Sequence, residues 1–396
     1  MSFRTYLDWN ATAPLCEAAR LAMSAAMEVA GNPSSVHSEG RAARGIVENA
    51  RENVARLVGA EPRNVIFTSG GTEASILALT PQIADGNDTR VRETLLVSAI
   101  EHPSVGSGGR FAHGQVRTVA VTAGGVLDLA DLAAQIEPLK QAGSGFLVSL
   151  MHANNESGVI QPVEQAAEIV HAAGGLLHVD AVQSAGKIPC DIRALGADLV
   201  SISAHKIGGP KGVGALVKAR EEIVVAPLLR GGGQERGARG GTENVIGIAG
   251  FGAAADAART ALPSVGARLA SLRTELEAAL QAIDGSTVVF GRAASEGGPS
   301  RLPNTVLFAV PDVKAETALI ALDLAGVAVS SGSACSSGKV SHSHVLAAMG
   351  VPDELSACAV RVSLGPTTSK ADIEKFTAAW TAHVANLTKG RRGIAA

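Results

Sequence analysis

Two apolar segments of this chain are each followed by a side chain that could hold a reactive cofactor. Residues 198–203 are followed by Lys206, and residues 176–179 are followed by Asp180. Because parallel strands end at one edge of a sheet, these two side chains are expected to meet there. A lysine amine forms a Schiff base with an aldehyde and a carboxylate keeps a pyridine nitrogen protonated, so the pair predicts pyridoxal phosphate. A surface lysine and a turn or cap aspartate look the same in isolation, so the prediction depends on further motifs.

Two further strand ends carry groups suited to the phosphate and the ring of such a cofactor. Residues 68–73 read Thr-Ser-Gly-Gly-Thr-Glu between a predicted strand and a predicted helix. Gly71 would let the backbone approach a phosphate, and Thr72 would add a hydroxyl donor beside the free N–H groups of the helix. His102 follows the next strand, where an imidazole could stack on the ring and move protons. A helix-capping turn and a loop histidine are the alternatives.

Three other segments offer polar contacts. Asn155 follows residues 145–150, and Gln183 follows Asp180. Their side-chain amides suit a phenolic oxygen or a carboxylate. Adjacent Asn residues such as Asn154 and Asn155 also form turns, which is the alternative. Arg361 lies alone on one face of an apolar strand, where its guanidinium could bind a carboxylate bidentately or be solvated. Residues 231–244 combine glycines with two arginines. That loop is either an anion clamp offered to a neighbouring subunit or a plain surface loop.

The four cysteines differ in their surroundings. Cys335 lies in Ser-Ser-Gly-Ser-Ala-Cys-Ser-Ser-Gly at residues 330–338, and such small polar neighbours favour an exposed thiol that moves to a substrate. Cys16, Cys190 and Cys358 are interpreted as small packing residues. Since the chain has no Cys-x-x-Cys pair, the thiols are predicted to be reduced, in a cytoplasmic protein with neither a disulfide framework nor a zinc site.

Length and composition predict a two-domain α/β protein. A chain of 396 residues is too long for one ordinary core. The net charge of -3 and the charged fraction of 18% give no basic footprint for nucleic acid. No apolar run has the length of a membrane span and the first residues do not resemble a signal peptide, so we expect a cytoplasmic protein that contacts no membrane.

Short β-rich runs alternate with Ala-rich helical runs through the first two-thirds of the chain, which predicts a mostly parallel seven-stranded sheet covered on both faces. The predicted strands are residues 64–68, 94–98, 115–120, 145–150, 176–179, 199–203 and 214–217, with helices such as 42–58 and 162–173 between them. A long amphipathic helix, 262–283, precedes further strands at 304–309 and 359–363. We therefore expect a large domain of residues 15–258 and a smaller α+β domain of residues 1–14 and 259–396.

Together, these motifs resemble the cysteine desulfurases, pyridoxal phosphate enzymes of the class V aminotransferase group. The shared segments run nearly end to end and are residues 7–12, 31–37, 69–73, 101–102, 154–156, 178–180, 203–206, 239–244 and 331–335. The resemblance implies the fold type I of pyridoxal phosphate-dependent transferases, which is aspartate aminotransferase-like. It also implies a homodimer that takes L-cysteine as substrate and passes its sulfur to an iron–sulfur scaffold or another acceptor protein.

The resemblance implies a role for each candidate side chain. Lys206 would carry the cofactor and move the α-proton, and Cys335 would attack the substrate sulfur, forming a persulfide and releasing alanine. The implied cofactor contacts are Asp180 to the ring nitrogen, Gln183 to the phenolic oxygen, His102 on the ring, Gly71, Thr72, Ser203 and His205 at the phosphate, Asn155, and Thr242 from the partner subunit. Asn155 and Arg361 would bind the substrate carboxylate. No intrinsic metal is implied, although Cys335 could be a transient iron–sulfur ligand.

The chain departs from the usual family pattern at a few positions. Trp9 stands where Asn is common, Gly71 replaces a frequent Ala, and the histidines His342 and His344 follow the cysteine segment. The chain ends at residues 390–396 without the long tail by which housekeeping desulfurases dock a scaffold. Together with Gln234 and residues 240–244, this favours a nitrogen-fixation subtype.

Several alternatives stay open. A class V aminotransferase or a selenocysteine lyase would share the cofactor site, and Cys335 in its Ser/Gly segment is the feature that separates a desulfurase from a transaminase. A cofactor-free sulfur-relay protein would use Cys335 alone and would be colourless. A catalytically inactive scaffold is the last alternative, and the presence of Lys206, Asp180 and His102 argues against it.

Overall fold

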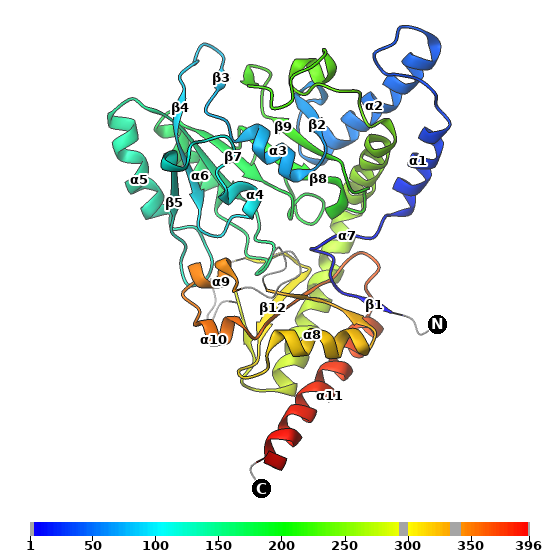
Figure 1. Cartoon of the computed structure of the whole chain (residues 1–396), viewed down its shortest axis with the longest axis vertical. Coiled ribbons are helices and arrows are strands. Elements are labelled where there is room, and N and C mark those ends of the chain that lie inside the picture. The colour runs from blue at the N-terminus through cyan, green and yellow to red at the C-terminus, as the bar shows by residue number, and fades with distance from the viewer. Residues whose placement is uncertain (1–3, 293–299, 333–341, 395–396) are drawn as a thin grey trace.

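The structure, a computed structural model, describes residues 4–292, 300–332 and 342–394, with side chains described up to residue 386 (Figure 1). Cys335 lies outside the described residues. A large upper part contains a seven-stranded sheet, and a smaller lower part contains a four-stranded sheet. The helix α7 (Val245–Ile283) runs from one part into the other.

The large sheet explains how distant segments reach one edge. Its strands lie in the order β2 (Val65–Thr68), β9 (Gly214–Lys218), β8 (Leu199–Ser203), β7 (Leu176–Asp180), β6 (Gly145–Met151), β4 (Arg92–Ser98) and β5 (Val116–Val119). All neighbouring pairs from β8 to β5 are parallel, and β9 runs antiparallel to both of its neighbours. The predicted mostly parallel sheet of seven strands is therefore confirmed.

Both faces of this sheet are covered because buried side chains alternate along its strands. Leu96 and Val148 belong to one core, which includes residues of α2 (Ser38–Leu57), α5 (Leu129–Gln141), α6 (Val163–Ala172) and α7. Leu95 and Leu147, the preceding residues of the same strands, belong to a second core with α3 (Gly71–Ala78) and α4 (Pro103–Gly106). The two helices predicted at 42–58 and 162–173 are confirmed as α2 and α6, with small shifts at their ends.

The smaller part is built on the strand order β11 (Val288–Val289), β12 (Thr305–Ala309), β15 (Ala359–Ser363) and β14 (Ser330–Ser331). Its core contains the T-shaped pair Phe308 and Trp380, with ring centroids 5.0 Å apart. The helices here are α8 (Ala315–Leu324), α9 (His344–Ala348), α10 (Asp353–Ser356) and α11 (Lys370–Ile394). The domain boundaries at residues 14/15 and 258/259 stay a prediction.

The remaining elements are short or peripheral. They are β1 (Thr5–Tyr6), α1 (Glu17–Met27), η1 (Pro62–Asn64), β3 (Ile83–Asp85), η2 (His113–Gln115), η3 (Ala204–Lys206), β10 (Ile223–Val225), η4 (Gln234–Gly237) and β13 (Val327–Ala328). β1 pairs in parallel with β13 of the smaller part. The segment after β1 then crosses to the large sheet, where the backbone N–H of Ala13 donates to the carbonyl of His205 over 2.8 Å.

The helix predicted at 262–283 begins much earlier than expected, at Val245. The predicted helix does not include these glycine-rich first turns, where a Cβ at Gly252 would lie 2.4 Å from the Cα of Ala50 in α2. These glycines therefore allow close helix packing instead of making a turn. By length and composition α7 could cross a membrane, yet its first turns are buried against α1 and α2, as in the core helix of a globular protein.

Candidate active site

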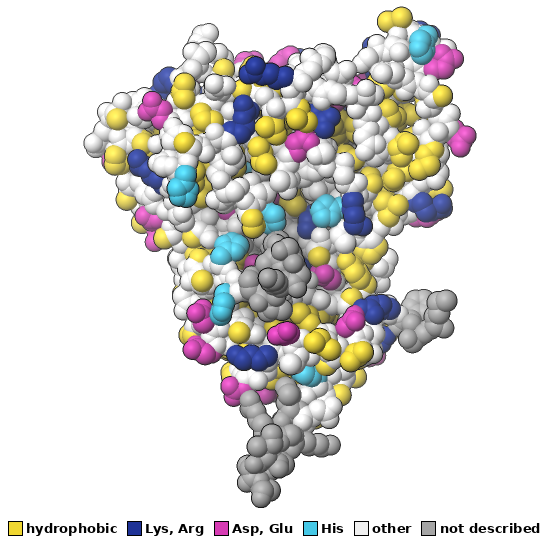
Figure 2. Space-filling model, in the orientation of Figure 1, with side chains coloured by type: hydrophobic (Ala, Val, Ile, Leu, Met, Phe, Trp, Pro, Cys, Tyr) yellow, Lys and Arg dark blue, Asp and Glu magenta, His cyan; other side chains and the backbone are white. Residues whose placement is uncertain are grey.

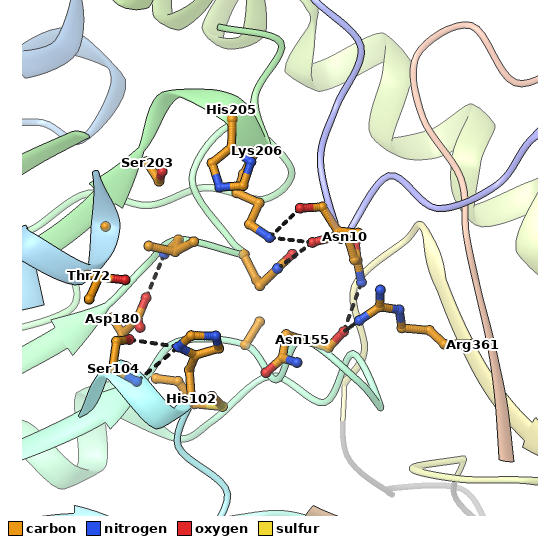
Figure 3. A pocket seen from close by; sticks show the side chains of 16 residues that line it. Asn10, Thr72, His102, Ser104, Asn155, Asp180, Ser203, His205, Lys206 and Arg361 are labelled. Carbon is orange, nitrogen blue, oxygen red and sulfur yellow. Dashed lines mark hydrogen bonds between the residues drawn. The ribbon is translucent and has the colours of Figure 1, made fainter. Parts of the chain in front are cut away.

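The carboxyl edge of the large sheet faces the smaller part across a cavity of about 250 Å³ (Figure 3). Ten of the predicted site residues line this cavity: Gly71, Thr72, His102, Asn155, Asp180, Gln183, Ser203, His205, Lys206 and Arg361. On the face seen in Figure 2, histidine and basic side chains gather where the upper and lower parts meet. The cavity between the large sheet and the smaller part thus collects residues that are separated by up to 290 positions, from Gly71 to Arg361.

Lys206 lies in η3, immediately after β8, and its amine is held by backbone (Figure 3). Its Nζ donates to the carbonyl oxygens of Asn10, at 2.6 Å, and Ala11, at 2.8 Å. Both acceptors belong to the segment that crosses from the smaller part. The Lys206 amine is therefore held by a segment that comes from the smaller part.

Asp180 is the last residue of β7 and its side chain is buried beside the cavity. Burial raises the pKa of its carboxyl to about 6, although the N–H of Val182, which donates to Oδ1 over 2.9 Å, and the charge of Lys206 both oppose the shift. A buried carboxylate of raised pKa is stabilised by a protonated ring nitrogen placed next to it. Asp180 is therefore suited to pair with a pyridinium.

His102 caps the short helix α4 that follows β4. Its Nδ1 accepts from the backbone N–H of Ser104 over 3.1 Å and lies 2.7 Å from the Ser104 hydroxyl. Burial, together with the charges of Lys206 and His344, lowers the pKa of His102 to about 4. The ring is thus neutral at physiological pH, and because Nδ1 is an acceptor, its proton is on Nε2.

The turn between β2 and α3 forms a second recess, which Thr72, Ser203, His205 and Lys211 line. A Cβ at Gly71 would lie 3.0 Å from Val182 Cγ2 and 3.3 Å from Ser203 Cβ, so an alanine here is tightly confined. Burial and the charges of Lys206, Lys211 and Lys187 lower the pKa of His205 to about 4. Helix N–H groups, hydroxyls and the Lys211 ammonium suit this recess to an anion.

Arg361 and Asn155 lie on the side of the cavity formed by the smaller part and the end of β6. Arg361 donates to the backbone oxygen of Asn155 over 3.0 Å and to the carboxylate of Asp8 over 2.9 Å. Its Nε is buried and has no hydrogen-bond partner among the described residues. Arg361 also lines the cavity, where a guanidinium is suited to a carboxylate.

Among the predicted site residues that the structure describes, one does not line the cavity. Thr242 is exposed on the segment that leads into α7. Cys335 lies outside the described residues, and the chain on either side of residues 333–341 packs near Glu156, whose carboxylate accepts from the Ser343 hydroxyl. Burial raises the pKa of Glu156 to about 7. Of the other cysteines, Cys190 and Cys358 are buried as expected, and Cys16 is only half-buried.

Asn10 is a site residue that the sequence reasoning missed. Its side-chain amide donates to the carbonyl of Asn155 over 3.2 Å, and its own carbonyl accepts from both Lys206 and Gln183. It also joins Thr305 of the smaller part, which accepts from Nδ2 over 2.9 Å. The available signal was the motif at residues 7–12, which belongs to the resemblance but has no assigned role there.

Comparison with known proteins agrees with this geometry. Residues 5–376 match the model of the aminotransferase class-V family. A cysteine desulfurase IscS from Dictyoglomus turgidum is 39% identical over 377 residues, which cover 94% of this chain and 92% of that protein.

Two solved structures are also similar. A NifS-like protein from Rickettsia africae is 34% identical with a TM-score of 0.85, covering 97% of this chain and all of that chain. A structure described as SspA in complex with cysteine is 28% identical with a TM-score of 0.74, covering 92% of this chain and all of that chain. With a family model that matches nearly the whole chain and relatives of this similarity, the protein belongs to the class-V aminotransferase family and is a homologue of the cysteine desulfurases.

Proposed function

We propose that this protein is a pyridoxal phosphate-dependent cysteine desulfurase, which removes sulfur from L-cysteine, releases L-alanine and holds the sulfur as a persulfide on Cys335. The observation that carries the proposal is the convergence of Lys206, Asp180 and Arg361 on one cavity from three different elements. An amine, a buried carboxylate and a guanidinium in one cavity suit an aldehyde cofactor and an amino acid substrate. Relatives named cysteine desulfurase support the same reaction.

The residues around the cavity fit pyridoxal phosphate. Asp180 offers a buried carboxylate for the ring nitrogen, and the recess at Gly71 offers close backbone approach and basic neighbours for the phosphate. The proposed contacts are Thr72, Ser203 and His205 to the phosphate, Gln183 to the phenolic oxygen, Asn155 near the ring and His102 stacked on it. When bound, the cofactor supplies an electron sink that stabilises negative charge at the α-carbon of the substrate.

Lys206 is the proposed acceptor and donor of the α-proton. The carbonyls of Asn10 and Ala11 hold its amine at the cavity, which limits the positions that the proton carrier samples. His102 would stay neutral through the reaction because its pKa is about 4, so it would act as a stacking group and as a donor through Nε2. Asn155 and Arg361 would bind the substrate carboxylate and so orient its α-carbon toward Lys206.

Cys335 is the proposed nucleophile. Its thiolate would attack the sulfur of the substrate, so that an S–S bond forms as the C–S bond breaks, and the β-carbon keeps the electron pair and takes up a proton to give alanine. The persulfide sulfur would then pass to an acceptor protein, which we propose is an iron–sulfur scaffold that serves nitrogen fixation. We also propose a cytoplasmic homodimer in which Thr242 reaches the partner subunit's phosphate site.

Mass spectrometry after exposure to L-cysteine tests the proposed function. Without reductant, the peptide containing Cys335 should gain the mass of one sulfur while alanine accumulates. Cys335→Ala should still bind the cofactor and remain yellow but release almost no alanine, whereas the matched variant Cys358→Ala should keep the activity of the parent. Alanine formation without a persulfide on Cys335 would contradict the mechanism. Transamination products would indicate an aminotransferase. A preference for selenocysteine would indicate a selenocysteine lyase, and a colourless active protein would indicate a cofactor-free sulfur carrier.

Subunit mixing tests the shared site. Lys206→Ala subunits and Thr242→Ala subunits are each expected to be impaired, and a mixed dimer should have one site with both changes and one with neither. Some activity should therefore return on mixing. Active monomers in sedimentation, or no recovery in a mixture shown to contain mixed dimers, would contradict the shared site.

A further inference from the structure

Lys187 lies behind the cavity and contacts two residues of its wall. Its Nζ donates to Gln183 Oε1 over 2.8 Å and to Asn10 Oδ1 over 2.9 Å. Gln183 and Asn10 both line the proposed active-site cavity, whereas Lys187 lines a second, largely apolar cavity of about 370 Å³. Lys187 therefore touches the site through these two side chains and is not itself a lining residue of the first cavity.

The contacts of Lys187 determine which end of the Gln183 amide faces which neighbour. An amide group has nearly the same shape after its oxygen and nitrogen exchange places, so only its partners set its orientation. The Lys187 amine donates to both Asn10 Oδ1 and Gln183 Oε1, and these hydrogen bonds place Oε1 on the side of Lys187. The Nε2 group then donates one hydrogen to the Asn10 carbonyl over 2.9 Å and keeps a second hydrogen for a group in the cavity.

We propose that Lys187 is a positioning residue, which fixes the Gln183 amide so that it presents only N–H to the phenolic oxygen of the cofactor. The inference rests on the proposed function, since it assumes that the phenolic oxygen lies at Gln183. The reversed amide would place Oε1 against an oxygen that carries negative charge, and that arrangement is repulsive. Both contacts of Gln183 to described residues, to Lys187 and to Asn10, oppose the reversal.

The surroundings of Lys187 disfavour its charged form. Its two oxygen partners are neutral amides, and burial, together with the charges of Lys206 and Arg361, lowers its pKa well below the usual value. His205, on η3, also lies within reach of its charge. The N–H that Gln183 presents would favour the deprotonated form of the phenolic oxygen, because hydrogen bonding to the charged form of a group stabilises that form.

Measurement of cofactor affinity and of its visible absorbance tests the proposal without relying on turnover. Lys187→Met should weaken pyridoxal phosphate binding about tenfold, the order expected when a hydrogen bond to a charged group is lost. It should also raise the pH midpoint of the cofactor's visible absorbance change by roughly one unit. Lys218→Met is the matched control. Lys218 is also partly buried and its amine donates to two backbone carbonyl oxygens, but it lies at the end of β9 and lines neither of the two cavities.

Variants at Gln183 separate orientation from general damage. Gln183→Glu places an acceptor on both sides of the group, so it should reproduce the weaker binding and the raised midpoint with Lys187 intact. In a Gln183→Ala background, Lys187→Met should have little further effect on affinity, because its influence passes through Gln183. Lys187→Arg should restore most of the affinity, since the second cavity has room for the longer side chain.

The outcomes distinguish this inference from the proposed function. If the parent binds no pyridoxal phosphate, the proposed function itself fails. If the parent binds it and Lys187→Met matches the parent, or if the losses from Lys187→Met and Gln183→Ala simply add, the positioning role is wrong. If Lys187→Met does not fold, Gln183→Glu and Lys187→Arg still decide: tight binding by Gln183→Glu, or no binding by a folded Lys187→Arg, would overturn the proposal.

Discussion

Removal of Arg51 should destabilise the large part of the protein strongly, because it leaves a buried carboxylate without its counter-ion. Arg51 on α2 binds Glu235 with two hydrogen bonds, of 2.7 and 2.9 Å, and both side chains are nearly inaccessible, at 5% and 3% exposed. Glu235 also accepts from the backbone N–H of Phe67 in β2. It does so from the left-handed region of backbone conformation, with φ of 47°, which is an unfavourable position for a glutamate.

The size of the effect follows from what each variant leaves behind. In Arg51→Met, Glu235 keeps only the Phe67 N–H of its three hydrogen bonds, and the contact of the guanidinium with the Phe67 ring at 4.8 Å is lost. A buried charge left in this way costs about 3–5 kcal/mol. Glu235→Gln should cost less, about 1–3 kcal/mol, because Arg51 retains its contact with Glu48 at 3.2 Å. Since the residues are in contact, the double variant should lose about 0.5–3 kcal/mol less than the sum of the single variants.

Hydrogen exchange at the Phe67 amide is the sharpest assay, because this amide donates directly to Glu235. A loss of about 3 kcal/mol corresponds to exchange more than roughly 100-fold faster. Far-ultraviolet circular dichroism in urea should report the overall loss of stability. Loss of less than about 1 kcal/mol in Arg51→Met, with unchanged exchange at Phe67, would refute the account of this ion pair.

Three other changes have expected outcomes. Gly365→Ala should destabilise by about 1–3 kcal/mol or displace the indole, because a Cβ there would lie 1.9 Å from Trp9, and a lower melting temperature with altered Trp fluorescence would show it. His171→Gln should lower the free energy of unfolding by less than about 1 kcal/mol below pH 6 and have little effect above pH 8. The reason is that the Asp198 carboxylate, at 2.9 Å, raises the pKa of His171, and the resulting stabilisation is lost as pH rises through the folded pKa. Equal effects in urea titrations at both pH values would contradict this. Asp180→Asn should retain bound cofactor but reduce alanine production at least about 100-fold, since the ring loses its anionic partner, and near-parental turnover would disprove the role of Asp180.

The strands of the large sheet, and the polar residue that follows each of them, can be predicted from the sequence alone. Apolar runs such as 176–179 and 199–203 are long enough to be buried strands, and the residues after them follow from chain order alone. Once the strands are taken as parallel, the edge at which Asp180 and Lys206 meet needs no further information. The motifs that resemble those of the cysteine desulfurases indicate the same pyridoxal phosphate chemistry, and the comparisons with known proteins confirm the family.

The polar side chains that support the carboxyl edge of the large sheet can be identified from the tertiary structure but not from the sequence. Asn10, Lys187 and the pair of Arg51 and Glu235, 184 positions apart, are ordinary polar residues in the sequence. Their importance arises because a buried amide, ammonium or carboxylate must find a partner, and packing brings those partners from distant segments. The start of α7 was missed for the same reason: its glycines are explained by the approach of α2, a contact that no local pattern contains.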